Sequence, residues 1–163
     1  MIVILMGVAG SGKTTIGQAL AATIEWEFCD ADWFHSTTAK EKMNRGEPLT
    51  DVDRQPWLQS LQTAIAQWLQ EKKNVILACS TLKASYRQIL CNNDPQVKLV
   101  YLQGSYELIE QRLRDRLGHF MNANLLQSQF DTLEVPTAGE AIYIDISQDL
   151  EAIVQEIRNF LRV

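Results

Sequence analysis

The chain has 163 residues, of which 46% are hydrophobic and 21% are charged, a composition typical of one globular domain with a sizeable core. Its formal net charge of −5 argues against a nucleic-acid-binding surface, which would need clustered basic side chains. Three unclustered cysteines lack metal-site spacing and fit a reducing compartment, and the apolar N-terminus lacks the basic segment of a signal peptide. We therefore expect a single cytoplasmic domain over residues 1–163, with no membrane span and no nucleic-acid partner.

Five apolar runs of strand length are separated by segments with helical periodicity. They lie at residues 2–6, 27–29, 75–79, 97–102 and 141–146. The runs are nearly continuous rather than alternating, which is typical of parallel strands covered by helices on both faces. The sequence thus predicts an α/β fold with three layers, α/β/α, around a five-stranded parallel sheet.

A complete G-x-x-x-x-G-K-[ST] motif follows the first apolar run and leads into a helical segment. This order suits a phosphate-binding P-loop, because glycines let backbone N–H groups turn toward a polyphosphate and the helix N-terminus adds partial positive charge. Lys13 would neutralise β- and γ-phosphate oxygens, and Thr14 would offer its hydroxyl to Mg²⁺. The predicted nucleotide-binding residues are Gly7, Val8, Ala9, Gly10, Ser11, Gly12, Lys13, Thr14 and Thr15.

Two aspartates, Asp30 and Asp32, end the second apolar run. Ligands gather at the carboxyl ends of parallel strands, so both should lie near the P-loop. The third run ends in Cys79-Ser80 and supplies no carboxylate, which favours Asp30 as the acidic partner of the metal. A kinase acting on a hydroxyl needs a carboxylate to orient or deprotonate it; Asp32 is the stronger candidate and Asp30 the first alternative. Alternatively, both are solvated turn or cap residues.

Cationic and donor side chains follow in the next segment. Arg54 can grip a carboxylate with two parallel hydrogen bonds, while Lys42 and His35 can add charge or donors. Each also has a structural interpretation: Lys42 as a solvated helix charge, Arg54 as the partner of a nearby aspartate, and His35 as a polar residue where a helix begins. Trp57 is expected in the core or in the pocket wall.

Polar residues and glycine mark several helix boundaries. Asp53 is predicted to cap the helix that carries Trp57, with Pro56 in its first turn. Ser105 and Ser147 are predicted to open two later helices, and Gly46 is predicted to end an earlier one.

Arg112 and Arg116 are four residues apart and therefore share one helix face. Gly118 follows, and an arginine pair beside a glycine suits a lid over ATP, at about residues 112–130. Such a lid stabilises charge on the transferring phosphoryl group and excludes water. His119 would touch phosphate or acceptor, or pack within the closed lid. The alternative is a basic helix face balanced by neighbouring carboxylates, and the division of roles between the two arginines stays open.

Several segments together resemble the signature of the gluconokinases. They are residues 32–35 (Asp-x-x-His), 42–58 (Lys-Met-x-x-Gly-x-Pro-Leu-x-Asp-x-Asp-Arg-x-Pro-Trp-Leu), 79–87 (Cys-Ser-x-Leu-Lys-x-x-Tyr-Arg) and 118–136, which is similar to the family's lid. The resemblance implies ATP-dependent phosphorylation of D-gluconate to 6-phosphogluconate, with Mg²⁺, on a fold like those of shikimate and nucleoside-monophosphate kinases. It adds Lys83 to the predicted acceptor contacts, and because similar kinases are often dimers it implies a possible homodimer.

The chain departs from that pattern at four positions. Ala31 stands where the family usually has glycine, Ser36 and Asn122 where it has proline, and Ala39 where it has asparagine. Ala39 bears most on function, because an amide there would recognise acceptor hydroxyls. The alternatives are therefore a kinase for another polyol acid or a shikimate-like acceptor, and, from a different class, a nucleotide-dependent switch. The chain lacks the Asn-Lys-x-Asp motif of a guanine-specific switch.

Overall fold

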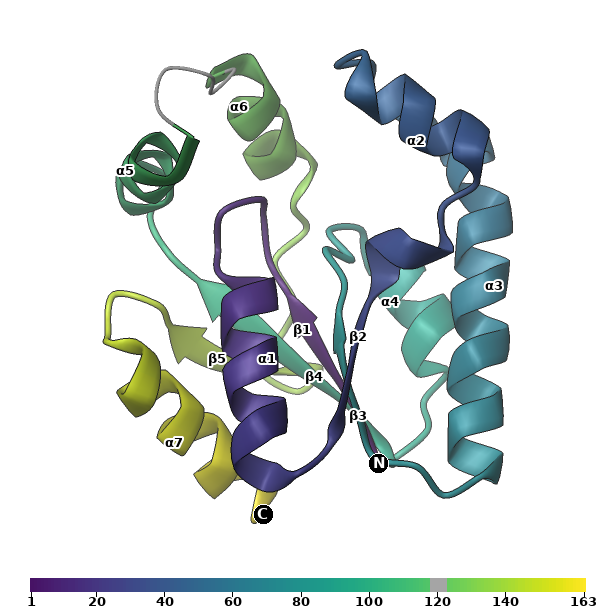
Figure 1. The fold of residues 1–163 in the computed structure, drawn as a ribbon, viewed down its shortest axis with the longest axis vertical. Helices are drawn as coiled ribbons and strands as arrows, with labels where there is room; N and C mark the ends of the chain where they lie inside the picture. Colours follow the sequence, from purple (N-terminus) through teal and green to yellow (C-terminus); the bar gives the residue numbers. More distant parts are fainter. Residues whose placement is uncertain (118–122) are drawn as a thin grey trace.

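A computed structural model describes residues 1–117 and 123–163 of the chain. In these two segments, five strands form one parallel sheet in the order β2-β3-β1-β4-β5 (Figure 1). The strands are β1 (Ile2–Met6), β2 (Glu27–Asp30), β3 (Val75–Ala78), β4 (Val97–Gln103) and β5 (Ala141–Asp145). The predicted parallel sheet is confirmed, and each predicted strand matches an observed one to within one residue at its end.

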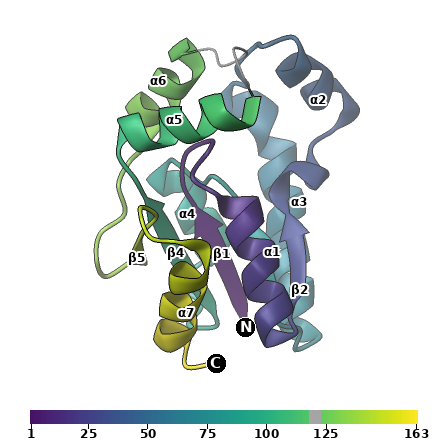
Figure 2. The same cartoon turned by 60° about the vertical axis from the view of Figure 1, so that its left-hand side comes forward.

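Helices cover both faces of this sheet and the carboxyl ends of its strands. The helical elements are α1 (Lys13–Ile24), the 3₁₀ turn η1 (Ala31–Phe34), α2 (Thr37–Asn44), α3 (Asp51–Gln70), α4 (Ala84–Cys91), α5 (Tyr106–Leu117), α6 (Ala123–Thr132) and α7 (Leu150–Leu161). α1 and α7 pack together on one face, and α3 and α4 on the other (Figure 2). α2, α5 and α6 lie beyond the carboxyl ends of the strands (Figure 1). The predicted three-layer α/β/α fold is therefore confirmed.

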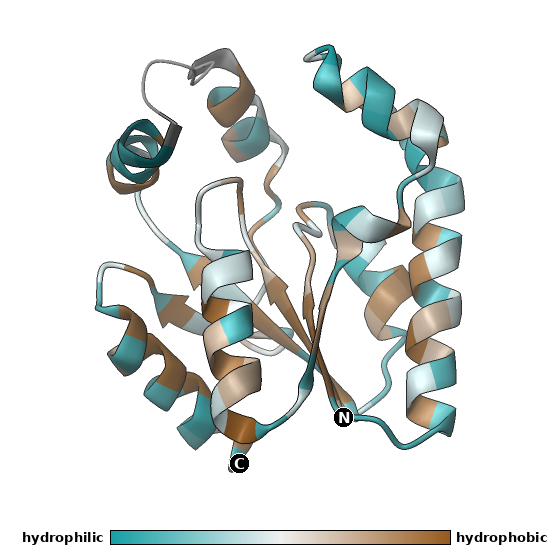
Figure 3. Ribbon diagram, in the orientation of Figure 1, coloured by the Kyte–Doolittle hydropathy of each residue, from teal (hydrophilic) through white to brown (hydrophobic). Residues whose placement is uncertain are grey.

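Two hydrophobic cores, one on each face of the sheet, hold the layers together. Val3 and Leu5 of β1 belong to the core under α1 and α7. Ile2, Ile4 and Met6 belong to the core under α3 and α4, because side chains alternate between the faces of a strand. All of β1 is buried, and it forms part of the continuous apolar centre in Figure 3. A strand covered on both faces therefore has the unbroken apolar run seen in the sequence.

The beginning of α3 differs from the prediction. Thr50 is the N-cap, and its hydroxyl accepts the backbone N–H of Asp53 at 3.1 Å. The Asp53 carboxylate in turn accepts the N–H of Thr50 at 2.8 Å, which completes a capping box. The prediction of Asp53 as the N-cap is wrong, because an acidic residue suits the third helical position as well as the cap. Pro56 consequently lies in the second turn of α3 and not the first.

The other predicted helix boundaries have mixed outcomes. The Ser105 hydroxyl accepts a backbone N–H from the first turn of α5 at 3.2 Å, as predicted. Gly46 follows α2 with φ +75°, a left-handed conformation suited to a helix stop. The prediction for Ser147 is wrong, because Asp149 caps α7 by accepting an N–H at 2.8 Å. Ser147 instead donates its own N–H to Asp145 at 2.8 Å, so a turn precedes the helix.

The environment of the cysteines agrees with an unbridged set. Cys79 is buried, Cys29 and Cys91 are half-buried, and all three are free thiols. Among the described helices, none combines the length and the hydropathy needed to cross a membrane.

Candidate active site

The glycine loop between β1 and α1 has a backbone that favours glycine. Gly10 has φ +81°, and Gly12, the residue before α1, has φ +94°. A Cβ atom at Gly10 would also lie 2.5 Å from the side chain of Leu113 on α5. Position 10 therefore requires glycine both for its dihedral angle and for the close approach of α5. Val8 and Ser11 have buried side chains, so they offer a ligand only their backbone.

We expect Gly10→Ala to weaken nucleotide binding by about ten-fold or more. Backbone strain of this kind costs about 1–3 kcal/mol, and the loop must also shift away from Leu113. Calorimetric titration with a non-hydrolysable ATP analogue measures the change. Gly46→Ala is the matched control, because Gly46 also has positive φ but no atom lies within 4 Å of the added Cβ. Equal nucleotide affinities for the two variants would contradict the loop assignment.

Lys13, the first residue of α1, folds back over the glycine loop. Its Nζ donates hydrogen bonds to the carbonyl oxygens of Gly7 and Val8, both at 3.0 Å. Burial lowers the pKa of Lys13, while nearby negative charge, including that of Asp32 and Asp30, acts in the opposite direction. The ammonium group is thus associated both with the loop and with the two predicted carboxylates, as a group that neutralises the transferring phosphate should be.

Thr14 and Asp30 meet at the carboxyl end of β2. The Thr14 hydroxyl donates to Asp30 Oδ2 at 3.3 Å. Mg²⁺ prefers oxygen ligands and is commonly bound by one or two protein groups together with phosphates and water. No cluster of three or more His, Cys, Asp or Glu suited to a metal occurs in the described part of the chain. A hydroxyl and one carboxylate next to a phosphate loop fit Mg²⁺ that arrives with a nucleotide.

Asp32 projects from η1, whose backbone is fixed by its neighbours. Asp30 Oδ1 accepts the N–H of Asp32 at 2.9 Å and so caps the turn. The Asp32 side chain is 79% exposed, and its Oδ1 lies 3.9 Å from Nε2 of the buried His35. Desolvation by the surrounding site, followed by the negative charge of Asp30, raises the pKa of Asp32. Asp32 is therefore open to an acceptor and more basic than an ordinary aspartate.

The two predicted lysine contacts are paired with aspartates of the first turn of α3. Lys42 Nζ lies 2.8 Å from Asp53 Oδ2, and Lys83 Nζ lies 2.8 Å from Asp51 Oδ1. Hydrogen bonds from Lys42, and then from Thr50, lower the pKa of Asp53 to about 2. Both lysines thus lie near α3, with their charges balanced by carboxylates.

Arg54 keeps its charge available. Its Nη1 donates to the hydroxyl of Tyr86 at 3.4 Å, and its guanidinium group lies 5.8 Å from the centre of the Tyr86 ring. The Tyr86 hydroxyl in turn donates to Asp51. Among the described residues, no carboxylate lies within ion-pair distance of Arg54, so the expected alternative of a direct Arg54–aspartate pair does not occur. A half-buried guanidinium without a carboxylate is suited to an anionic ligand.

Arg112 and Arg116 line one cavity beside the glycine loop, as expected from their shared helix face. The cavity has a volume of about 220 Å³, and Thr15 and Gln148 line it as well. Arg112 also donates to the carbonyl oxygen of Ile146, which anchors it to the segment after β5. The cavity therefore joins α5, the glycine loop and the beginning of α7. His119 lies outside the described residues.

Two residues that sequence reasoning did not assign contact the predicted site. Gln129 of α6 accepts the backbone N–H of Ala9 at 2.6 Å and so ties α6 to the glycine loop. Trp57 of α3 donates its Nε1–H to the carbonyl oxygen of Ala31 at 2.7 Å. Neither contact has a local sequence signal, because the partners are 120 and 26 residues apart.

The departures from the gluconokinase pattern have defined surroundings where the structure describes them. Ser36 caps α2, since its hydroxyl accepts the N–H of Ala39 at 3.1 Å. Ala39 itself is 7% exposed and Ala31 is 1% exposed, so both alanines are packed. Asn122 lies outside the described residues.

A five-stranded parallel sheet, a glycine loop with its lysine, and carboxylates at the end of β2 together define a P-loop kinase. The profile of the shikimate kinase family matches residues 9–161. The chain belongs to this family and, by the identities that follow, to its gluconokinases.

Three relatives illustrate the likeness. The chain is 44% identical to a probable gluconokinase of Dictyostelium discoideum, over 99% of this chain and 86% of the relative. It is 41% identical to the thermoresistant gluconokinase of Escherichia coli, over 94% of this chain and 89% of the relative. The crystal structure of a gluconokinase from Sinorhizobium meliloti is 39% identical and covers 98% of this chain and 90% of its own, with a TM-score of 0.86.

Proposed function

We propose that the chain transfers the γ-phosphoryl group of ATP to D-gluconate and forms 6-phospho-D-gluconate. The observation that carries the proposal is Arg54, a cation free of carboxylate partners among the described residues, on the helix that packs against the turn bearing Asp32. One group suits the acceptor carboxylate and the other suits an acceptor hydroxyl. We assign the whole chain to one kinase domain, with an acceptor-binding region at about residues 32–58 and a lid at about residues 112–130.

The acceptor is oriented between its two ends. Arg54 holds the carboxylate by paired hydrogen bonds, and Asp32 accepts the proton of the hydroxyl that attacks the phosphorus atom. Lys42, Lys83 and His35 surround the same region and contribute charge and donors to the intervening hydroxyls. His119 is retained as a further contact with the acceptor or the phosphate.

The nucleotide is bound on the other side of the site. Backbone N–H groups of the glycine loop and Lys13 hold its phosphates, and Arg112 and Arg116 stabilise charge on the transferring group. Mg²⁺ would be held by Thr14 and Asp30 and would offset phosphate charge when bound. Closure of the lid excludes water, which would otherwise compete with the acceptor hydroxyl. ATP as co-substrate and three free thiols support a cytoplasmic location.

A shikimate-like acid is the second candidate acceptor. The match to the shikimate kinase profile favours it, and so does Arg54, which can hold any carboxylate. Ala39 leaves out a side chain amide that would select acceptor hydroxyls. A panel of acceptors in an assay of ATP consumption separates the two candidates. The assignment is lost if gluconate accelerates ATP consumption no more than a blank without acceptor.

Arg54→Ala should raise the KM for gluconate by about ten- to a hundred-fold, because a charge-assisted hydrogen bond contributes about 1.5–3 kcal/mol. The KM for ATP should stay unchanged. Arg54→Lys keeps the charge but loses the paired geometry, so it should recover only part of the loss. Steady-state kinetics with each substrate varied in turn measures both constants. An unchanged KM for gluconate in Arg54→Ala would place the acceptor carboxylate elsewhere.

A further inference from the structure

Trp57 is buried against the turn that carries Asp32. Its Nε1–H donates to the carbonyl oxygen of Ala31 at 2.7 Å, and the residue is only 8% exposed. That carbonyl belongs to the peptide group directly before Asp32. A buried hydrogen bond at this point fixes the backbone from which the Asp32 carboxylate projects.

The same indole ring also holds the other end of the turn. It stacks on the imidazole of His35, with 4.6 Å between ring centres and 8° between their planes. The backbone N–H of His35 donates to the carbonyl oxygen of Asp32 at 3.3 Å, and its Nε2 lies 3.9 Å from Asp32 Oδ1. Trp57 thus contacts the residues on both sides of Asp32.

Arg54 is on the same helix, three residues before Trp57, so the two side chains lie on neighbouring positions of one face. A buried ring between them and the turn means that Asp32 cannot shift relative to Arg54 without breaking the Trp57–Ala31 hydrogen bond or the Trp57–His35 stack. In the proposed function, these two groups hold opposite ends of the acceptor. The packing of one tryptophan therefore sets the length of the acceptor that fits between them.

We propose that Trp57 is a positioning residue that acts through Asp32 and Arg54 and selects acceptors by the separation of their carboxylate and their reacting hydroxyl. The inference rests on the proposed function. A misplacement of about 1 Å between reacting groups can reduce turnover about 100-fold. The penalty depends on acceptor length, because a shorter acid fits only when the turn is free to move.

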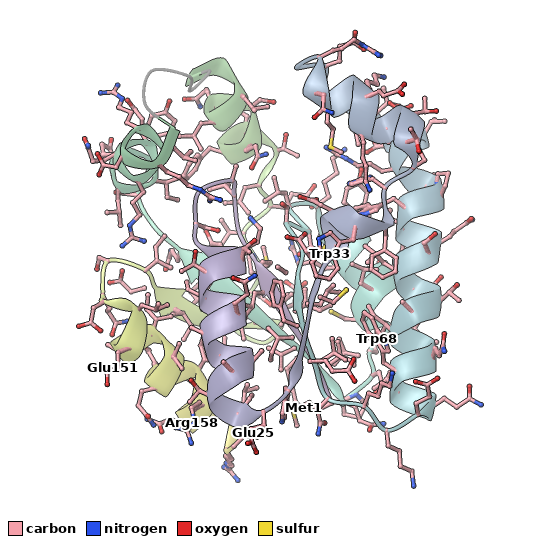
Figure 4. All side chains as sticks on the ribbon, viewed as in Figure 1. Met1, Glu25, Trp33, Trp68, Glu151 and Arg158 are labelled. Carbon is pink, nitrogen blue, oxygen red and sulfur yellow. The ribbon has the colours of Figure 1, made fainter. Side chains whose placement is uncertain are left out.

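Trp68 supplies a matched control on the same helix. It makes an edge-to-face contact with Phe34 of the same turn, at 6.4 Å and 80°. Trp68 is half-buried and packs on the same core as Trp57 (Figure 4). Within the described residues it makes no hydrogen bond to the turn. Loss of packing alone is therefore common to both tryptophans, whereas fixation of the Asp32 backbone belongs to Trp57.

The test compares Trp57→Phe and Trp68→Phe with the unmodified protein. For each, kcat and KM are measured for ATP, for gluconate and for the five-carbon acid with one CHOH unit fewer. Trp57→Phe should lower kcat with gluconate by about 10- to 100-fold at an unchanged KM for ATP. Its preference for the six-carbon over the five-carbon acid should fall at least about five-fold. Trp68→Phe should lose thermal stability while it keeps both kcat and preference.

A second variant keeps the test decisive if phenylalanine at position 57 destabilises the fold. Benzothienylalanine at that position keeps the shape of the indole ring and removes only the N–H donor, and it should reproduce the loss of kcat and of preference. Unchanged acceptor preference in both position-57 variants, or equal losses in Trp68→Phe, would overturn the inference. If the unmodified protein phosphorylates neither acid, the proposed function itself fails.

Discussion

Asp32→Asn is expected to lower kcat with gluconate by about 10²–10⁴-fold, while ATP still binds. The amide keeps the shape of the carboxylate but cannot accept the proton of the attacking hydroxyl. Asp32 is the exposed carboxylate of η1, and desolvation and Asp30 raise its pKa above the usual value, as suits a base. Single-turnover kinetics with saturating ATP isolates the chemical step from substrate binding and product release.

Asp30→Asn is the informative comparison, because Asp30 contacts Thr14 and lies two residues from Asp32. This change should raise the Mg²⁺ concentration needed for half-maximal rate, whereas Asp32→Asn should leave that concentration unchanged. If Asp32→Asn retains the original kcat, the catalytic carboxylate is elsewhere, and Asp30 is the first residue to examine.

Lys13→Met should reduce turnover by about 10³-fold. Methionine fills nearly the same volume but removes the ammonium group that donates to Gly7 and Val8 and would neutralise the transferring phosphate. The effect should fall mainly on kcat, since charge on the phosphoryl group develops in the transition state. Steady-state kinetics with varied ATP separates kcat from KM.

Lys98→Met serves as the control for lost positive charge, because Lys98 is exposed on β4 and away from the glycine loop. It should retain normal turnover. Near-normal turnover in Lys13→Met would instead show that the γ-phosphate is not held at this end of the loop.

Contiguous patterns made the fold and half of the site predictable. The glycine loop is a continuous motif, so the positions of Lys13 and Thr14 follow from their place between a strand and a helix. The apolar run of β1 indicated a strand covered on both faces, and the two cores on either side of it explain why. Asp30 and Asp32 were placed at the carboxyl end of β2 because parallel strands share that edge.

Contacts between distant residues were not predictable in the same way. The pairing of Lys83 with Asp51 joins α3 to the segment before α4, 32 residues apart, and local charge patterns gave no reason to prefer it. The Trp57–Ala31 hydrogen bond is equally silent in sequence, since an apolar stripe predicts burial but not the partner of an indole N–H. The Thr50 cap was missed for a different reason, because hydroxyl and acidic residues suit both positions of a capping box.

Phosphorus NMR of the product formed from ATP and D-gluconate tests the central claim most directly. The proposed function requires a monoester whose phosphorus couples to the protons of carbon 6, the end of the acceptor opposite the carboxylate held by Arg54. The spectrum is predicted to show this one new monoester in equal amount to the ADP released. Inorganic phosphate in place of an ester, or a phosphate on another carbon, would contradict the account.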